Sequence, residues 1–371
     1  MAHNVEKEID GVIRTVTELD HTAQEIDDAV EVTKVHSNPQ LLDNWYWADP
    51  DSIIDQRGGW IVPYGTPFYS DVALSAQVTT VQAPWFAATY INETYGSIYT
   101  DNQTFYVRRS DMVRGYAGPV YSIDRWFIVR DGSIVVSENE ISFETHSGVP
   151  YFCQPVGDKI RGKTVTLSVL GSDGNLHSGT AYVPETGVID GVARFGLLSN
   201  TCVVDITDVN DNICVRFFTD HIGSHGLKAV KLEFGSQQTL ARQDENGNWV
   251  LIDPPPNKQQ ELAKCQRHQI ELCHSAGSFI GIGTATAETD CKCICPIPVT
   301  LRSNPQLVTS GNFVLYSSGG VSMVAVTNLY FNAGGNGAVG IGATVASGLT
   351  AGQPYKLYSL PIAKCLLDAN L

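Results

Sequence analysis

The sequence predicts a mainly β protein in three parts: an N-terminal trimeric coiled coil, a central β-sandwich of the jelly-roll type and a C-terminal β-sandwich tip. Three observations lead to this prediction. Apolar residues near the N-terminus follow a heptad spacing, and the chain beyond them alternates short Val/Ile/Thr runs with Gly and Pro turns. A run of prolines at 254–256 forms a stiff linker between two such regions. We place the parts at residues 1–36, 37–253 and 257–371.

The coiled coil is predicted from apolar residues that recur at alternating spacings of four and three. These residues are Val5, Ile9, Val12, Val16, Leu19, Ala23, Ile26 and Val30. A strict 3.5-residue period favours a coiled coil over an amphipathic helix lying on a domain, because a straight helix drifts off such a stripe. β-Branched residues at both core positions of the heptad disfavour a dimer and permit a trimer. We therefore expect a parallel homotrimer.

The central part shows the alternation of half-buried strands. Residues 164–169 (TVTLSV) alternate with period two, and short strand-like runs follow at 202–206, 213–218 and 227–234. Many short strands with frequent turns indicate a sandwich or jelly roll. We expect Trp126 and Trp249 in its core, and Trp45 and Trp47 at the junction between the coiled coil and the sandwich.

The composition disfavours several classes of partner. A formal net charge of −15 repels phosphate backbones, so nucleic acid is not an expected partner. No apolar run approaches the roughly 18 residues of a membrane-spanning helix, so no membrane insertion is expected. The first residues, MAHNVEKEID, lack the apolar segment of a signal peptide, which predicts assembly in a cytoplasm. In that setting the nine cysteines are expected to be reduced and mostly buried.

A series of short motifs runs in a fixed order along residues 38–371. They are 41–44 (LLDN), 56–58 (QRG), 121–126 (YSIDRW), 151–155 (YFCQP), 228–235 (KAVKLEFG), 261–267 (ELAKCQR) and 366–371 (LLDANL). Their order resembles that of tail-fibre proteins in phages and prophages of Gram-positive gut bacteria. The resemblance implies a jelly roll similar to carbohydrate-binding modules, within a trimeric virion fibre that binds the host surface.

The chain departs from this family pattern at one place. The Gln-Arg-Gly and Asp-Arg-Trp motifs lie close together in the pattern, whereas here an inserted subdomain at 59–123 separates them. The insertion carries 13 of the 34 aromatic residues of the chain. Aromatic rings stack on the apolar faces of sugars, and short polar side chains bond the hydroxyl groups. The candidate ligand-binding residues are Trp60, Tyr64, Trp85, Tyr95, Tyr99, Asp101 and Asn102. The alternative is that these aromatics fill the core of the insertion.

Three other clusters of residues are candidates for catalysis or for metal binding. They are the carboxylates Glu138, Glu140 and Glu144, the turn-like group Asp205, Asp208, Asn210, Asp211 and Asn212, and the possible zinc ligands Cys265, His268, Cys273, His274, Cys291, Cys293 and Cys295. A glycosidase needs two carboxylates that face the same glycosidic bond. These glutamates also fit the solvated face of a strand whose Ile141 and Phe143 point inward. The spacings match neither an EF-hand nor a zinc finger. We therefore predict no catalytic residue, no metal and no cofactor.

The C-terminal part lacks charge over a long stretch, with no Lys, Arg, Asp or Glu between Arg302 and Lys356. Such a module suits burial between identical subunits, or a glycan-binding tip. Together these features predict a non-enzymatic fibre that attaches the virion to a host cell-surface glycan. It would sit in the virion tail, bound to other tail or baseplate proteins, after assembly in the bacterial cytoplasm. The alternatives are a tail-associated glycan depolymerase and a purely structural tail or baseplate component.

Overall fold

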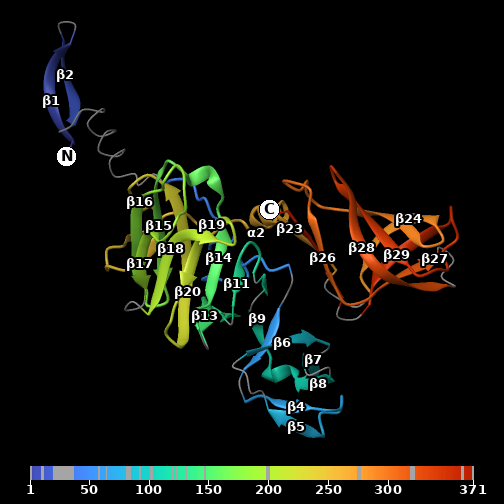
Figure 1. The fold of residues 1–371 in the computed structure, drawn as a ribbon. Coiled ribbons are helices and arrows are strands. Elements are labelled where there is room, and N and C mark those ends of the chain that lie inside the picture. The colour runs from blue at the N-terminus through green and yellow to red at the C-terminus, as the bar shows by residue number, and fades with distance from the viewer. Residues whose placement is uncertain are drawn as a thin grey trace.

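The computed structural model confirms a mainly β fold with antiparallel sheets (Figure 1). It describes residues 2–9, 12–19, 37–56, 59–63, 65–80, 85–91, 93–100, 103–117, 120–121, 123–130, 132–145, 148–197, 201–273, 277–317, 322–360 and 363–369. Among these residues there is one α-helix, α2 (Lys258–Gln266), and two short 3-10 turns, η1 (Arg109–Asp111) and η2 (Asp158–Ile160).

The N-terminal residues form two paired β-strands, so the predicted coiled coil is wrong over residues 2–9 and 12–19. Strand β1 (Ala2–Ile9) runs antiparallel to β2 (Val12–Leu19), and the predicted seam residues pair across it, Val5 with Val16 and Ile9 with Val12. The sequence between the strands is Asp10-Gly11, a pair typical of two-residue hairpin turns, and the flanking Val, Ile and Thr residues favour strands. Ala23, Ile26 and Val30 lie outside the described residues.

Two sheets enclose the core of the central sandwich. Five strands of the first sheet are, in order, β16 (Leu176–Tyr182), β15 (Thr164–Gly171), β20 (Gly223–Phe234), β13 (Ile141–Thr145) and β12 (Gly132–Val136). The second sheet comprises β10 (Val120–Tyr121), β11 (Phe127–Val129), β14 (Tyr151–Pro155), β19 (Asn212–Phe218), β18 (Cys202–Val209) and β17 (Val192–Leu197). The chain crosses between the sheets from β13 to β14 and again from β14 to β15. A small hairpin, β21 (Ala241–Gln243) with β22 (Trp249–Leu251), follows the last strand.

An aromatic cluster occupies the centre of this sandwich. The ring of Trp126 lies 5.1 Å from that of Trp47 and 4.8 Å from that of Phe152, and Phe217 completes the group. Trp126 is fully buried, as predicted. Trp47 is also fully buried in this cluster, so it is a core residue rather than a junction residue. Trp249 is only partly buried at the edge of the core.

The aromatic-rich insertion extends the first sheet beyond β12. The added strands are, in sheet order, β9 (Val113–Ala117), β3 (Trp60–Pro63), β6 (Trp85–Tyr90), β7 (Tyr95–Thr100), β8 (Gln103–Arg108), β4 (Pro67–Tyr69) and β5 (Gln77–Thr80). They enclose a small core of their own that is separate from the sandwich core. It comprises Val62, Phe68, Ile98, Val107 and Met112. In Figure 1 this subdomain projects from the sandwich.

The C-terminal part is a closed barrel with a small sheet, which corrects the predicted β-sandwich tip. The barrel strands are, in order, β24 (Phe279–Ala287), β25 (Asp290–Pro296), β29 (Ala338–Val345), β28 (Met323–Gly335), β27 (Phe313–Ser317) and β30 (Pro354–Ser359). The small sheet comprises β23 (Gln269–Cys273), β31 (Lys364–Asp368) and β26 (Gln306–Ser310). In Figure 1 the barrel lies on the far side of α2 from the sandwich.

Glycine makes the tight packing around the barrel possible. A Cβ added at Gly283 would lie 1.9 Å from the Lys292 carbonyl oxygen on the neighbouring strand, and one at Gly342 would lie 2.1 Å from the Tyr330 ring. Strand β24 pairs with β25 on one side and with β30 on the other, which closes the sheet on itself. Closure leaves no free sheet edge within the barrel.

Candidate functional site

The insertion holds the aromatic residues predicted to bind a ligand, and the structure gives two of them packing partners. Trp60 is half-buried, and the guanidinium carbon of Arg109 lies 3.7 Å from its ring centroid. Tyr95 is half-buried, with its ring edge-on to Tyr106 at 5.6 Å. One face of the Trp60 ring is therefore covered by a cation that stabilises it there, instead of being open to a sugar.

The other predicted ligand residues are described incompletely or not at all. Trp85 begins β6 and Tyr99 lies in β7, but their side chains are outside the described part of the structure. Tyr64, Asp101 and Asn102 lie outside the described residues altogether. Three further aromatics, Phe68, Tyr69 and Tyr116, are buried. For these the alternative interpretation, that the aromatics of the insertion fill cores, is correct.

Of the glutamate cluster only Glu144 lies on β13, whereas Glu138 and Glu140 belong to the turn between β12 and β13, so the three do not share one strand face as predicted. Ile141 and Phe143 are fully buried in the sandwich core. Glu144, the residue after Phe143, faces outward and is half-buried. Burial raises the pKa of Glu144, and a hydrogen bond from the Ser224 hydroxyl opposes that rise. Glu144 is therefore explained as the outward residue of a sandwich strand, and Glu138 and Glu140 as polar residues of a turn.

Two aspartates of the turn-like group, Asp205 and Asp208, have protein partners. Asp205 is fully buried and accepts two hydrogen bonds from the Arg216 guanidinium, at 3.0 and 2.7 Å. Asn210 and Asp211 both have positive φ, at 49° and 62°, and form the two-residue turn between β18 and β19. In the described parts of the chain, no three His, Cys, Asp or Glu residues are grouped in a way that could hold a metal ion.

All nine cysteines are buried and unpaired. Cys291, Cys293 and Cys295 share the inward face of β25, as the alternate spacing predicted, and the first two sulfur atoms lie 3.8 Å apart. Burial raises the pKa of Cys295 to about 12, so its thiol is protonated at neutral pH. These residues act as small apolar side chains of the barrel core.

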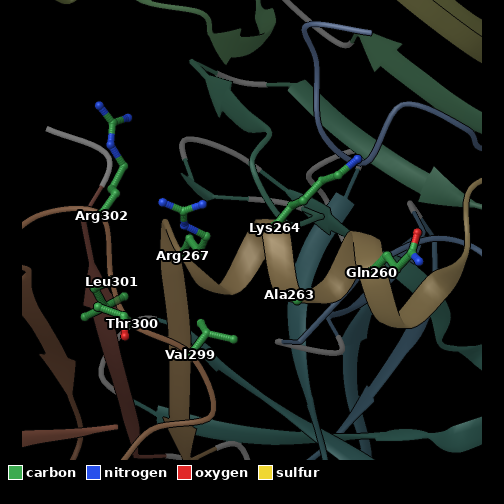
Figure 2. A pocket seen from close by; sticks show the side chains of 8 residues that line it. All are labelled: Gln260, Ala263, Lys264, Arg267, Val299, Thr300, Leu301 and Arg302. Carbon is green, nitrogen blue, oxygen red and sulfur yellow. The ribbon is translucent and has the colours of Figure 1, made fainter. Parts of the chain in front are cut away.

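A pocket of about 400 Å³ lies between α2 and the segment at 299–302 (Figure 2). We call it the α2 pocket. Its lining consists of Gln260, Ala263, Lys264, Arg267, Val299, Thr300, Leu301 and Arg302. Three of these residues are cationic and none is acidic, although the chain as a whole has a net charge of −15. Figure 2 shows the charged ends of Lys264, Arg267 and Arg302 extending to the same side, above the apolar side chains of Ala263, Val299 and Leu301.

Helix α2 is capped at its N-terminal end and is fixed to neighbouring segments in its middle and at its C-terminal end. The Asn257 side chain caps its first turn by accepting hydrogen bonds from the backbone N–H groups of Gln259 and Gln260, each at 3.1 Å. In the middle, the buried Glu261 carboxylate accepts from the Asn44 N–H of the sandwich and from the Lys264 ammonium. At the C-terminal end, the Arg302 N–H donates to the Arg267 carbonyl at 2.9 Å, which holds the two arginines side by side.

His268, next to the α2 pocket, is neutral. Burial lowers its pKa to about 3, and the nearby Arg125, Arg302 and Arg267 add to this effect against the opposing charge of Asp43. A neutral ring leaves its Nδ1 atom free to accept the N–H of Arg302, and the two nitrogens lie 3.4 Å apart. His268 therefore positions one arginine of the pocket.

The low pKa of His268 predicts an acid-sensitive fold. Its folded pKa lies below the ordinary value of 6.5, so below about pH 6.5 the unfolded chain binds a proton that the folded chain rejects. The titration of His268 therefore leaves the free energy of unfolding unchanged above about pH 6.5. Below that pH, the free energy of unfolding decreases by up to about 1.4 kcal/mol for each unit by which the pH is lowered. Urea unfolding at a series of pH values measures this loss. The slope should flatten in His268→Gln and persist in the exposed control His221→Gln; equal slopes in all three proteins would contradict the assignment.

A second pocket, of about 290 Å³, adjoins the first. Thr300 and Leu301 line both, and the second continues along Ser303, Asn304 and Asn336 with the backbone of Gly334 and Gly335. Its lining is uncharged. The amide and hydroxyl groups can form hydrogen bonds with the hydroxyl groups of a neutral sugar. The two pockets together therefore form a longer site with one cationic part and one uncharged part.

The outer face of the barrel carries an aromatic row that the sequence did not reveal. Phe279 packs edge-on against Tyr358, which packs edge-on against Tyr316, each pair at 5.5 Å. Ile282 and Ile294 are paired directly across β24 and β25 and are 48% and 62% exposed. Ile282 and Ile294 meet through the local β24–β25 hairpin, but Phe279 and Tyr316 are distant in sequence from Tyr358 and meet it only through the strand order of the barrel, so no local pattern could have identified the aromatic row.

Comparison with known proteins assigns no relative: no family model matches the chain, and no curated protein matches it. Within the described part of the chain, no helix is both long and apolar enough to cross a membrane.

Proposed function

We propose that this chain is a homotrimeric receptor-binding fibre protein of a bacteriophage tail, which holds a host cell-surface glycan without cleaving it. The motif order along residues 38–371 supports this proposal through its resemblance to phage tail fibres. The central sandwich would then be the jelly-roll module of such a fibre. The protein would be assembled in the bacterial cytoplasm and joined in the virion to other tail or baseplate proteins.

One observation carries the proposal, namely the outer surface of the barrel. No charged residue occurs between Arg302 and Lys356, and Phe279, Ile282, Ile294 and Met323 are all exposed. An exposed apolar surface of this kind is typical of a protein–protein or ligand contact, because a soluble monomer gains nothing by presenting it to water. Identical subunits packed around an axis would cover it. With paired N-terminal strands in place of a coiled coil over residues 2–9 and 12–19, the barrel becomes the main source of trimer contacts.

We expect light scattering to give a mass of about three times 40.3 kDa for the purified protein. The double variant Ile282→Asp/Ile294→Asp should dissociate into folded monomers, because each interface would bury unpaired carboxylates. Its matched control is Val188→Asp/Val250→Asp, which adds the same charges at exposed positions of the central part. A monomeric wild-type protein, or equal dissociation of both variants, would contradict the proposed assembly.

Glycan binding without cleavage has its own test. The fluorescently labelled protein should adsorb to cells of susceptible Gram-positive gut bacteria and release no reducing sugar from their walls or capsules. Glu140→Gln and Glu144→Gln should adsorb as well as the wild type. Measurable sugar release that disappears in either variant would instead support the depolymerase alternative. Failure to adsorb to any strain of a broad panel would favour the purely structural alternative.

A further inference from the structure

We propose that the α2 pocket binds the anionic group, a carboxylate or a phosphate, of an acidic sugar unit in the receptor glycan. This inference rests on the proposed function for the nature of the polymer, but the charge of the pocket is a property of the described residues alone. The first argument is the imbalance of charge. Lys264 forms an ion pair with Glu261 at 2.9 Å, whereas no ion pair joins Arg267 or Arg302 to a carboxylate of the described residues.

The two arginines are placed to act together. They come from different segments, the C-terminal end of α2 and the loop before β26, and the backbone hydrogen bond between them keeps them adjacent. Arg302 is further held by its contact with the neutral His268 ring. Guanidinium groups present planar forks of N–H donors that match carboxylate and phosphate oxygens. Two of them beside an open pocket form a preorganised anion site.

Helix stabilisation explains only part of this arrangement. Lys264 and Arg267 lie at the C-terminal end of α2, where cations interact favourably with the helix dipole. Arg302 belongs to no helix, and yet its charged end lies on the same side of the pocket in Figure 2. Bringing a third cation to this place raises the energy of the unliganded protein, because like charges repel. An anion bound between the arginines would remove that cost.

The surroundings of the cations fit a sugar better than a free inorganic ion. The apolar side chains of Ala263, Val299 and Leu301 lie below the charged groups and offer contact to the C–H face of a pyranose. The adjoining uncharged pocket at Ser303, Asn304 and Asn336 extends the site along the chain of the glycan. We therefore infer that the site takes an acidic unit in the α2 pocket, with a neutral unit beside it.

The test uses three sugars that differ only at carbon 6: glucose, glucuronic acid and glucose 6-phosphate. Saturation-transfer NMR on the intact protein measures binding of each. Glucuronic acid, glucose 6-phosphate or both should bind at least about tenfold more tightly than glucose, since hydrogen bonds to charged groups are the stronger ones. The comparison between the two acids identifies the anion, and added NaCl should weaken both. Equal binding of all three sugars, or no binding of any, would overturn the proposal.

The variant Arg267→Gln/Arg302→Gln should lose the preference for the acidic sugar, returning its affinity to that of glucose. The matched control Arg242→Gln/Lys258→Gln removes two exposed charges outside the pocket and should keep the preference for the acidic sugar. Light scattering on the same samples should show an unchanged mass. If the pocket variant dissociates instead, the arginines bind an acidic surface of another subunit and the proposal is wrong.

Adsorption assays separate this inference from the proposed function. If the pocket variant adsorbs to host cells as well as the wild type and the wild type shows no preference for acidic sugars, the fibre function stands and the anion site is wrong. If the wild type binds acidic sugars through the arginines but adsorbs to no host, the anion site stands and the fibre function is wrong. Loss of adsorption in the pocket variant, with normal adsorption of the control, supports both.

Discussion

Replacing Trp126 by alanine is expected to destabilise the central sandwich by about 3–5 kcal/mol. The side chain is fully buried between Trp47 and Phe152, and its indole N–H donates to the Asn44 carbonyl at 3.1 Å. The substitution therefore leaves both a large cavity and a buried carbonyl with one donor fewer. Loss of this magnitude is a large part of the stability of an ordinary domain. Urea unfolding followed by tryptophan fluorescence measures it.

The matched control is Trp249→Ala. That tryptophan lies at the edge of the same core and is only partly buried, so its removal should cost much less. The comparison tests whether the aromatic cluster, rather than tryptophan content, stabilises the sandwich. A loss at Trp249 as large as that at Trp126 would show that the core is wrongly placed.

Removal of the insertion is expected to leave a folded protein that no longer adsorbs normally to its host. The sandwich core contains no residue between Ile53 and Tyr116, so its packing does not depend on the excised part. Strands β3 and β9 pair antiparallel with Ile61 opposite Val113, so an Asn-Gly turn can join Pro63 to Asp111 in place of residues 64–110. Val62 and Met112 would lose their small core and should be changed to threonine.

The excision must stop short of β9. Tyr116 is buried in the sandwich core, and its hydroxyl oxygen accepts the Gly59 N–H at 2.9 Å and contacts the Asp55 carboxylate. Thermal unfolding and light scattering should show little change after the excision, while adsorption should fall severalfold because surface loops usually carry specificity. Unfolding of the sandwich would show that the insertion is structural. Normal adsorption of a folded protein would locate the receptor site elsewhere, with the α2 pocket as the first place to examine.

The sequence determined the strand content and the side-chain alternation of this protein. Period-two patterns correctly placed Ile141 and Phe143 inward and the thiols of Cys291, Cys293 and Cys295 on one face, because successive side chains of a strand must point in opposite directions. The heptad spacing at the N-terminus led to a wrong prediction. Val5, Ile9, Val12 and Val16 fit a heptad, but the same residues pair across two antiparallel strands, and their β-branched side chains favour the strands.

Only the tertiary structure decided the barrel and the α2 pocket. Closure of the barrel depends on β24 pairing with β30, a contact between segments far apart in the chain that neither segment's own pattern specifies. The pocket joins one face of α2 to the loop at 299–302, and its arginines are ordinary exposed residues when the sequence alone is considered. The charge of a site depends on which side chains meet and which lack a counter-ion. That is a property of three-dimensional packing, because electrostatic interactions depend on distance in space and not along the chain.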